Sequence, residues 1–236
     1  MRKALVVTAM MAAILIMVPA SQAVTLASLM SGGSLTVGDK VFDDFTCQVT
    51  NVNTGFTGTG CDATVTGITP SSTEEGIRFG GFFFAAGDGS SGALMDIQIT
   101  YDVATTSGAP IIHDVSMSFN ATNAIANAKA SVDEKVCAGD ITSPCGSPVA
   151  DIFVQRSQLG ANTVVKLSDH ADFSSLQSSV TVFKDIGLFA DKNGDVSFSI
   201  LDQTFSQVPE PGSIALLGTA LFGCAAVLRR RLKKNA

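Results

Sequence analysis

The sequence predicts an all-β protein whose main part is an antiparallel β-sandwich of the jelly-roll or immunoglobulin-like kind. Three observations support this prediction. Apolar and polar residues alternate in several short stretches, glycine-rich turn segments separate those stretches, and scarcely one window between the two ends of the 236-residue chain has a helical pattern. Many short strands with turns between them are typical of sandwiches and barrels.

Strict alternation with a period of two identifies strands that bury one face. It occurs at Met95 to Val103, Val115 to Phe119 and Val196 to Ile200, and a similar pattern covers Phe45 to Val49. The segments NVNTGFTGTG, AAGDGSSG and DKNGD have the composition of turns. These stretches therefore predict a series of strands joined by short connections.

Two stretches need a separate interpretation. Gly80 and Gly81 lie inside an apolar, aromatic run, and glycine inside a strand predicts a bulge or bend beside a buried aromatic cluster. The alanine-rich segment 122–135 is compatible with a helix, but the run from Ala130 to Val136 favours a strand.

The N-terminal segment, residues 1–23, has the features of a secretory signal peptide. Arg2 and Lys3 precede an uncharged apolar stretch from Ala4 to Val18, and small residues follow. Signal peptidase prefers small side chains before its cut, which predicts cleavage after Ala23, with Ala20 as an alternative site. A permanently anchored first helix is less well supported, because the apolar stretch is shorter than the roughly 20 residues that span a bilayer.

The C-terminal segment, residues 209–236, predicts a single transmembrane helix followed by a basic stop. Gly212 to Leu228 is an uncharged stretch of 17 residues, close to the lower limit for spanning a bilayer. The basic residues that follow it keep the tip in the cytoplasm and the preceding domain outside the inner membrane. These residues are Arg229, Arg230, Arg231, Lys233 and Lys234.

Pro209, Glu210 and Pro211 immediately precede this helix, and the two prolines hold the backbone extended. The order V-P-E-P-G-S, an apolar helix with LLG, and RRR resembles the C-terminal sorting signal of PEP-CTERM proteins. This resemblance implies that an exosortase recognises Pro209 to Gly212 and removes the tail on the way to the cell surface or the extracellular polysaccharide matrix. A plain stop-transfer anchor is the alternative.

The resemblance extends inward with less specific motifs. The segments SLTVGDKVFDDFTC, GIRFGGFF and DVSFSILDQTFSQ are similar to parts of uncharacterised β-rich PEP-CTERM passengers. They imply a β-rich surface protein and assign no catalytic residue.

The passenger, residues 24–208, is long enough for one domain with a sizeable core. It contains 20 acidic and 8 basic residues, a net charge of −12, which disfavours nucleic acid and anionic lipid as partners. The whole chain has no Trp and a single Tyr, Tyr101, so it lacks the aromatic residues that sugar-binding clefts commonly use.

Four cysteines lie in the passenger and predict disulfides in an oxidising compartment. Sequence proximity favours the local pairs Cys47 with Cys61 and Cys137 with Cys145, and free buried thiols are the alternative. None of these pairs has the C-x-x-C spacing of a redox or zinc site.

Asp191, Asn193 and Asp195 have the spacing that opens a calcium-binding loop, and Asp202 falls at the twelfth position. However, Val196 replaces the required glycine, so we predict a hairpin turn at Asn193 and Gly194 and no bound cofactor, with calcium as a weak candidate.

Candidate catalytic residues are few. The chain's two histidines, His113 and His170, each adjoin aspartates, and Glu74 and Glu75 are its one adjacent glutamate pair. Neither a G-x-S-x-G motif nor a third strong zinc ligand accompanies them, so we predict solvated loops at these positions and no enzyme activity.

The sequence therefore predicts an exported protein with a structural or adhesive role in exopolysaccharide or biofilm. Its expected processing partners are signal peptidase and exosortase, extracellular polysaccharide is an expected contact, and the inner membrane holds it transiently. A carbohydrate- or Ca²⁺-binding surface module is one alternative, and a secreted hydrolase is another.

Overall fold

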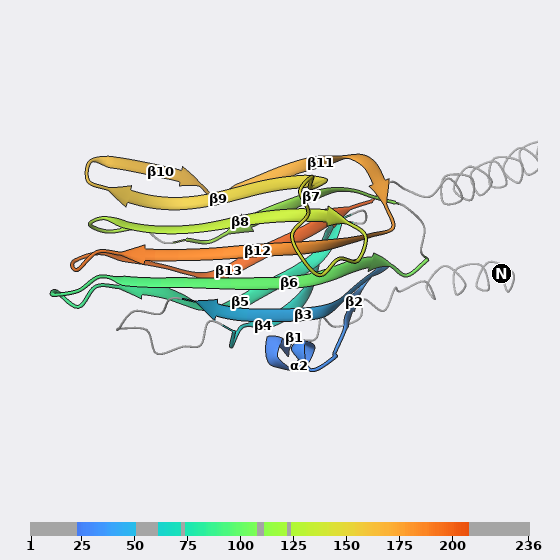
Figure 1. Cartoon of the computed structure of the whole chain (residues 1–236), viewed down its shortest axis with the longest axis horizontal. Coiled ribbons are helices and arrows are strands. Elements are labelled where there is room, and N and C mark those ends of the chain that lie inside the picture. The colour runs from blue at the N-terminus through green and yellow to red at the C-terminus, as the bar shows by residue number, and fades with distance from the viewer. Residues whose placement is uncertain (1–22, 51–60, 72–73, 108–110, 122–123, 208–236) are drawn as a thin grey trace, which may run out of the picture.

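Two antiparallel sheets pack face to face in the computed structural model, which describes residues 23–50, 61–71, 74–107, 111–121 and 124–207 (Figure 1). The all-β sandwich prediction is confirmed. The predicted signal peptide and transmembrane sorting helix lie outside the described residues. Within the described ranges, no helix has the length and apolar character needed to cross a membrane.

The sheets contain six and seven strands, and all pairs are antiparallel. The first sheet contains, in spatial order, β1 (Ala23–Thr25), β4 (Thr64–Ser71), β5 (Glu74–Ala86), β13 (Asp195–Ser206), β7 (Ile112–Phe119) and β11 (Ser168–Gln177). The second contains β10 (Asn162–Lys166), β9 (Ala150–Leu159), β8 (Ala128–Ala138), β12 (Ser179–Ala190), β6 (Ala93–Thr105), β3 (Lys40–Thr50) and β2 (Leu35–Val37). A short helix, α2 (Leu26–Met30), follows β1, and the Thr25 hydroxyl caps it by accepting a hydrogen bond from the Ser28 N–H at 3.2 Å.

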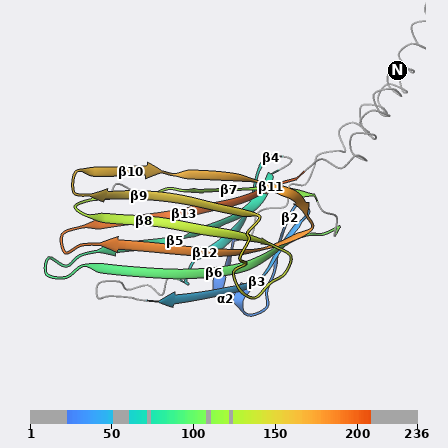
Figure 2. The ribbon, with the colours of Figure 1, turned by 45° about the horizontal axis from the view of Figure 1, so that its top comes forward.

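The central strands of the two sheets are consecutive in the chain. β12 pairs with β6 and β8 in the seven-stranded sheet, whereas β13 pairs with β5 and β7 in the six-stranded sheet. The two layers are visible in Figure 2. The segment 191–194 therefore crosses from one sheet to the other, and the predicted hairpin at Asn193 and Gly194 is wrong.

The turn geometry explains this crossing. The Gly194 N–H donates to the Asp191 carbonyl at 3.0 Å, which closes a tight turn. A Cβ on Gly194 would lie 2.6 Å from the carbonyl oxygen of Ala126, so only glycine fits at this close approach. Gly194 is needed here for space against a neighbouring backbone.

The alternating stretches form the predicted strands. In β6, Met95, Ile97, Ile99, Tyr101 and Val103 are buried at 0 to 1% exposure, as the period of two requires. The run from Ala130 to Val136 lies in β8, which confirms the strand interpretation over the helix.

An aromatic cluster fills one part of the core beside the predicted glycine bulge. The register between β5 and β13 shifts between the pairs Phe198 with Phe83 and Ile200 with Gly80, so β5 has one extra residue there. The Phe83 and Phe198 rings stack with centroids 4.4 Å apart. The bulge prediction is thus confirmed.

Both predicted disulfides are present. Cys47 of β3 is bonded to Cys61, which precedes β4, so this bridge joins an edge region of the seven-stranded sheet to the six-stranded sheet. Cys137 of β8 is bonded to Cys145 in the following connection.

Phe198→Ala is expected to lower the free energy of unfolding by about 3–5 kcal/mol, because it removes a stacked ring that is 1% exposed and leaves a cavity. Urea denaturation of the purified protein with its disulfides intact measures this change. Phe189→Ala is the matched control, since Phe189 is 42% exposed and its loss should change stability little. Equal effects of the two substitutions would contradict the core position of Phe198.

Candidate functional site

The outer face of the six-stranded sheet carries rows of polar side chains across neighbouring strands. Asp202 of β13 is in register with Arg78 of β5 and with Ser118 of β7. One step along, Thr204 of β13 is in register with Ser116 of β7. Side chains in register on antiparallel strands point to the same face of a sheet, so these residues form a continuous polar surface.

A groove of about 550 Å³ lies over these rows. Its lining includes the hydroxyl groups of Ser116, Ser118, Ser168 and Thr204, the carboxylates of Glu74, Asp169 and Asp202, the His170 ring, and the apolar Ile68 and Pro70. This volume falls within the range of about 300–1,000 Å³ that is usual for small-molecule sites. We take this groove as the candidate functional site.

Two hydrogen-bonded pairs fix two of the three carboxylates of the groove. The Arg78 Nε and Nη2 atoms donate to the two Asp202 carboxylate oxygens at 2.6 and 2.8 Å, a bidentate pair that raises the pKa of Arg78. The Thr204 hydroxyl donates to Glu74 Oε1 at 2.6 Å. These contacts hold the Asp202 and Glu74 carboxylates in defined positions at the surface.

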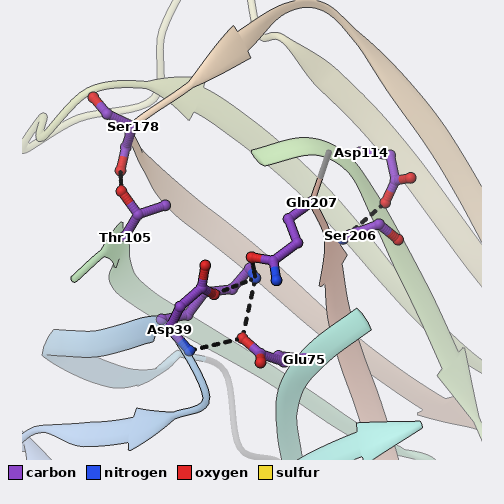
Figure 3. A network of polar contacts seen from close by, with 8 residues as sticks. Asp39, Glu75, Thr105, Asp114, Ser178, Ser206 and Gln207 are labelled. Atoms are coloured by element: carbon purple, nitrogen blue, oxygen red, sulfur yellow. Dashed lines mark hydrogen bonds and ion pairs between the residues drawn. The ribbon is translucent and has the colours of Figure 1, made fainter. Parts of the chain in front are cut away.

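The Glu74 and Glu75 side chains point to opposite faces of β5, as expected for neighbours on a strand, but the predicted solvated loop is wrong. Glu75 is 8% exposed and accepts hydrogen bonds from Lys40 Nζ at 3.2 Å and from the Asp39 N–H at 3.1 Å. Lys40 Nζ also contacts Gln207 Oε1 at 3.2 Å, at the end of β13 (Figure 3). Burial is the main cause of a raised pKa of Glu75.

The histidines also differ from the prediction, since both lie on strands and not on solvated loops. His170 of β11 is beside Ser116 of β7, with 2.9 Å between His170 Nδ1 and the Ser116 hydroxyl, and its Nε2 is 3.3 Å from Asp172 Oδ1. The order of these contacts matches a nucleophile, a base and an orienting acid. However, the Asp172 side chain is 79% exposed, whereas the orienting acid of a hydrolase triad is buried.

The side chain of His113 on β7 lies near that of Asp172 on β11. One ligand atom from each of His113, Asp114 and Asp172 lies within 4.8 Å of the others, and His113 Nδ1 is 3.0 Å from Asp114 Oδ2. The other Asp114 oxygen accepts a hydrogen bond from the Ser206 N–H at 3.0 Å (Figure 3). Imidazole nitrogen and carboxylate oxygen are zinc ligands, so these residues could hold a metal ion.

A second group that could hold a metal ion, Asp44, Asp102 and Asp140, lies on the seven-stranded sheet and in the connection after β8. Asp44 has a φ of 50° at an irregularity of β3 between Asp43 and Thr46. Burial is the main cause that raises the pKa of Asp102 to about 6; the hydrogen bond from Thr181 opposes this shift, and Asp140 and Asp44 add to it.

The predicted calcium candidates serve a structural role in the turn between β12 and β13. Asp191 Oδ1 accepts a hydrogen bond from the Asn193 N–H at 3.0 Å, and Asp191 Oδ2 accepts one from Asn127 Nδ2 at 2.8 Å. Asp195 is paired with Ile125 through its backbone. These contacts favour the turn interpretation of Asp191, Asn193 and Asp195.

Sequence reasoning missed Ser116, Ser118, Asp202 and Thr204 as members of one surface. The available signal was their position on the polar side of the alternating strands, where serine, aspartate and threonine recur. The missing information was the order of the strands, because β13 lies between β5 and β7 although it follows every other described strand along the chain.

The fold and the groove define a β-sandwich domain with a polar groove on one outer face. The chain carries the PEP-CTERM protein-sorting motif, which matches residues 207–231 and covers Pro209 to Gly212 and Arg229 to Arg231. This motif implies an exported protein that is processed by an exosortase. The comparison with curated proteins found no match.

Three solved structures share low similarity with the chain. The carbohydrate-binding module TmCBM61 in complex with beta-1,4-galactotriose has 9% identity and a TM-score of 0.29, over 66% of this chain and 86% of that one. A family 12 xyloglucanase from Bacillus licheniformis has 11% identity and a TM-score of 0.28, over 79% and 99%. The Glycosylation Associate Protein (Gap123) complex from Streptococcus agalactiae has 8% identity and a TM-score of 0.26, over 74% and 25%. At these values the similarities carry no argument about function.

The pKa of Asp102 is expected to be about 6 and to fall in Asp140→Asn, because that substitution removes the neighbouring carboxylate. In the wild type, the folded protein binds the Asp102 proton more tightly than the unfolded chain does. The contribution of Asp102 to stability is therefore present at acidic pH and is lost as the pH rises through about 6. An NMR titration of the carboxyl carbons measures the shift. Asp151→Asn is the control, and an equal change of the Asp102 pKa in both variants would contradict the assignment.

Proposed function

We propose that the passenger is a structural or adhesive domain that acts at the cell surface or in the extracellular polysaccharide matrix. In this proposal the groove on the six-stranded sheet contacts polysaccharide. The observation that carries the proposal is the continuous surface of hydroxyl and carboxylate groups over β5, β13, β7 and β11. The PEP-CTERM motif supports it by implying export.

The chemistry of the groove suits sugar hydroxyl groups. Carboxylates accept hydrogen bonds, hydroxyl groups both donate and accept them, and each sugar hydroxyl needs partners of both kinds when water is displaced. The Asp202 and Glu74 carboxylates are already held by Arg78 and Thr204, so a bound sugar would not have to order them. Ile68 and Pro70 add an apolar border for the CH groups of a sugar ring.

The aromatic content limits the affinity of one groove. The chain contains no Trp, and Tyr101 is fully buried, so neither can stack on a sugar from this face. We therefore propose weak contact by a single domain and firm retention where several copies are held together on one long polysaccharide, because linked weak sites gain avidity. A non-enzymatic role remains our prediction on this basis.

Processing by exosortase is expected to remove the C-terminal tail near Pro209 to Pro211. Intact mass and fractionation of the native protein from cells with and without the exosortase test this expectation. Loss of the tail and release from the inner membrane should occur only when the enzyme is present. A full tail and inner-membrane retention in both strains would overturn the matrix proposal, since the protein would then be an ordinary anchored protein.

Asp202→Asn is expected to weaken binding to exopolysaccharide purified from the producing bacterium by about tenfold, because it removes a charged acceptor and the bidentate pair with Arg78. Co-sedimentation with the polysaccharide measures the retained fraction.

Asp185→Asn is the matched control for this experiment, since it makes the same chemical change on the seven-stranded sheet. Thermal unfolding of both variants checks that they remain folded. Equal retention of the two variants and the wild type would refute the groove as the contact surface.

A further inference from the structure

A polar cluster lies in the apolar layer between the two sheets, directly beneath the groove. It consists of Lys184 of β12, Glu134 of β8 and Gln203 of β13, which are 2%, 1% and 0% exposed. Lys184 and Glu134 are cross-strand partners in the seven-stranded sheet, whereas Gln203 projects from the six-stranded sheet. The cluster thus brings an amine, a carboxyl group and a carboxamide together from three strands.

The Lys184 amine joins the other two functional groups. Lys184 Nζ donates to Gln203 Oε1 at 2.7 Å and also to Glu134 Oε2. The Glu134 carboxyl group interacts with the Gln203 side chain as well. Gln203 Nε2 donates to the Ser116 carbonyl at 3.1 Å, which orients the carboxamide. Glu134 therefore contacts the amine and lies beside the carboxamide.

Burial favours the uncharged forms of both Lys184 and Glu134. It lowers the pKa of Lys184 and raises the pKa of Glu134, and the attraction between the two groups opposes both shifts. The enclosed site thereby favours a neutral amine and a carboxylic acid more than water does. A neutral lysine amine is a nucleophile, and a carboxylic acid beside it can transfer protons.

We propose that Lys184 and Gln203 form an intramolecular isopeptide bond, with Glu134 as the acid–base group. Lys184 Nζ attacks the Gln203 side-chain carbonyl carbon, Cδ, so that the bond between Nζ and Cδ forms and the bond between Cδ and Nε2 breaks. Glu134, as a carboxylic acid, donates its proton to Nε2, which leaves as ammonia, and takes a proton from Nζ in exchange. The step consumes no oxidant or cofactor, and Glu134 ends in its starting form.

This bond would join the central strands of the two sheets. Lys184 and Gln203 are separated by 19 positions and lie on either side of the turn that crosses between the sheets. A covalent link there would hold the two layers together beneath the groove, and reducing agents would not break it. It differs in this respect from the bridges Cys47–Cys61 and Cys137–Cys145.

The same three residue types meet at Lys40, Glu75 and Gln207, and this second group serves as an internal comparison (Figure 3). There Lys40 Nζ also contacts the Asp39 carboxylate at 2.9 Å, and the Asp39 side chain is 31% exposed. A second carboxylate beside the amine, on a side chain that reaches solvent, distinguishes this group from the enclosed cluster at Lys184. We therefore expect no bond between Lys40 and Gln207.

Tandem mass spectrometry of peptides from the full-length wild-type protein tests the proposal. The protein is reduced, alkylated and digested with trypsin and chymotrypsin. We expect a cross-linked peptide pair that contains Lys184 and Gln203, with a mass below the sum of the two peptides by one ammonia molecule. Trypsin should fail to cut after Lys184.

Glu134→Gln is expected to abolish the cross-link, because it removes the proton-transferring group at nearly unchanged volume. Lys40→Met is the matched control and should leave the cross-link intact. Unmodified Lys184 and Gln203 peptides from the wild type would overturn the proposal, as would a link between Lys184 and Glu134 formed with loss of water. The wild-type result decides the matter even where a variant fails to fold.

Discussion

Burial of alternate side chains between the two sheets is the constraint on which the rest of the structure depends. β12 and β13 lie at the centres of different sheets and are joined by the short segment 191–194, so their inward side chains must meet. In β13, Leu201, Gln203 and Phe205 are buried, whereas Asp202 and Thr204 line the groove. The chemistry of the core and that of the outer surface are therefore set by neighbouring residues of one strand.

The polar groups within the apolar layer are costly features of this arrangement. Removing a lysine and a glutamate from water costs several kcal/mol per ion in general, and their attraction and hydrogen bonds offset that cost only when the geometry is good. Lys184 has both Glu134 and Gln203 as partners, while Glu134 Oε1 has none among the described residues. A covalent bond between Lys184 and Gln203 would leave a neutral amide and a neutral Glu134 carboxylic acid in this layer, which lowers the cost of burial.

The position of the groove relates the passenger to its sorting signal. β13 carries Asp202 and Thr204 and ends at Ser206, and Gln207 is held by Lys40. In the sequence, Pro209 follows two residues later. The strand that forms the middle of the groove thus ends at Ser206, directly before the segment that the sorting motif matches, residues 207–231.

The sequence by itself determined the features that depend on local pattern. Alternation identified β6, β7 and β13, short separation favoured the two disulfides, and composition distinguished the ends of the chain from the passenger. Tertiary structure alone decided that His113 and His170 both lie near Asp172, that Glu75 is buried, and that Lys184 meets Gln203. The physical reason is that a period of two shows which residues share a face of a strand, whereas the register and the order of strands decide which remote residues become neighbours.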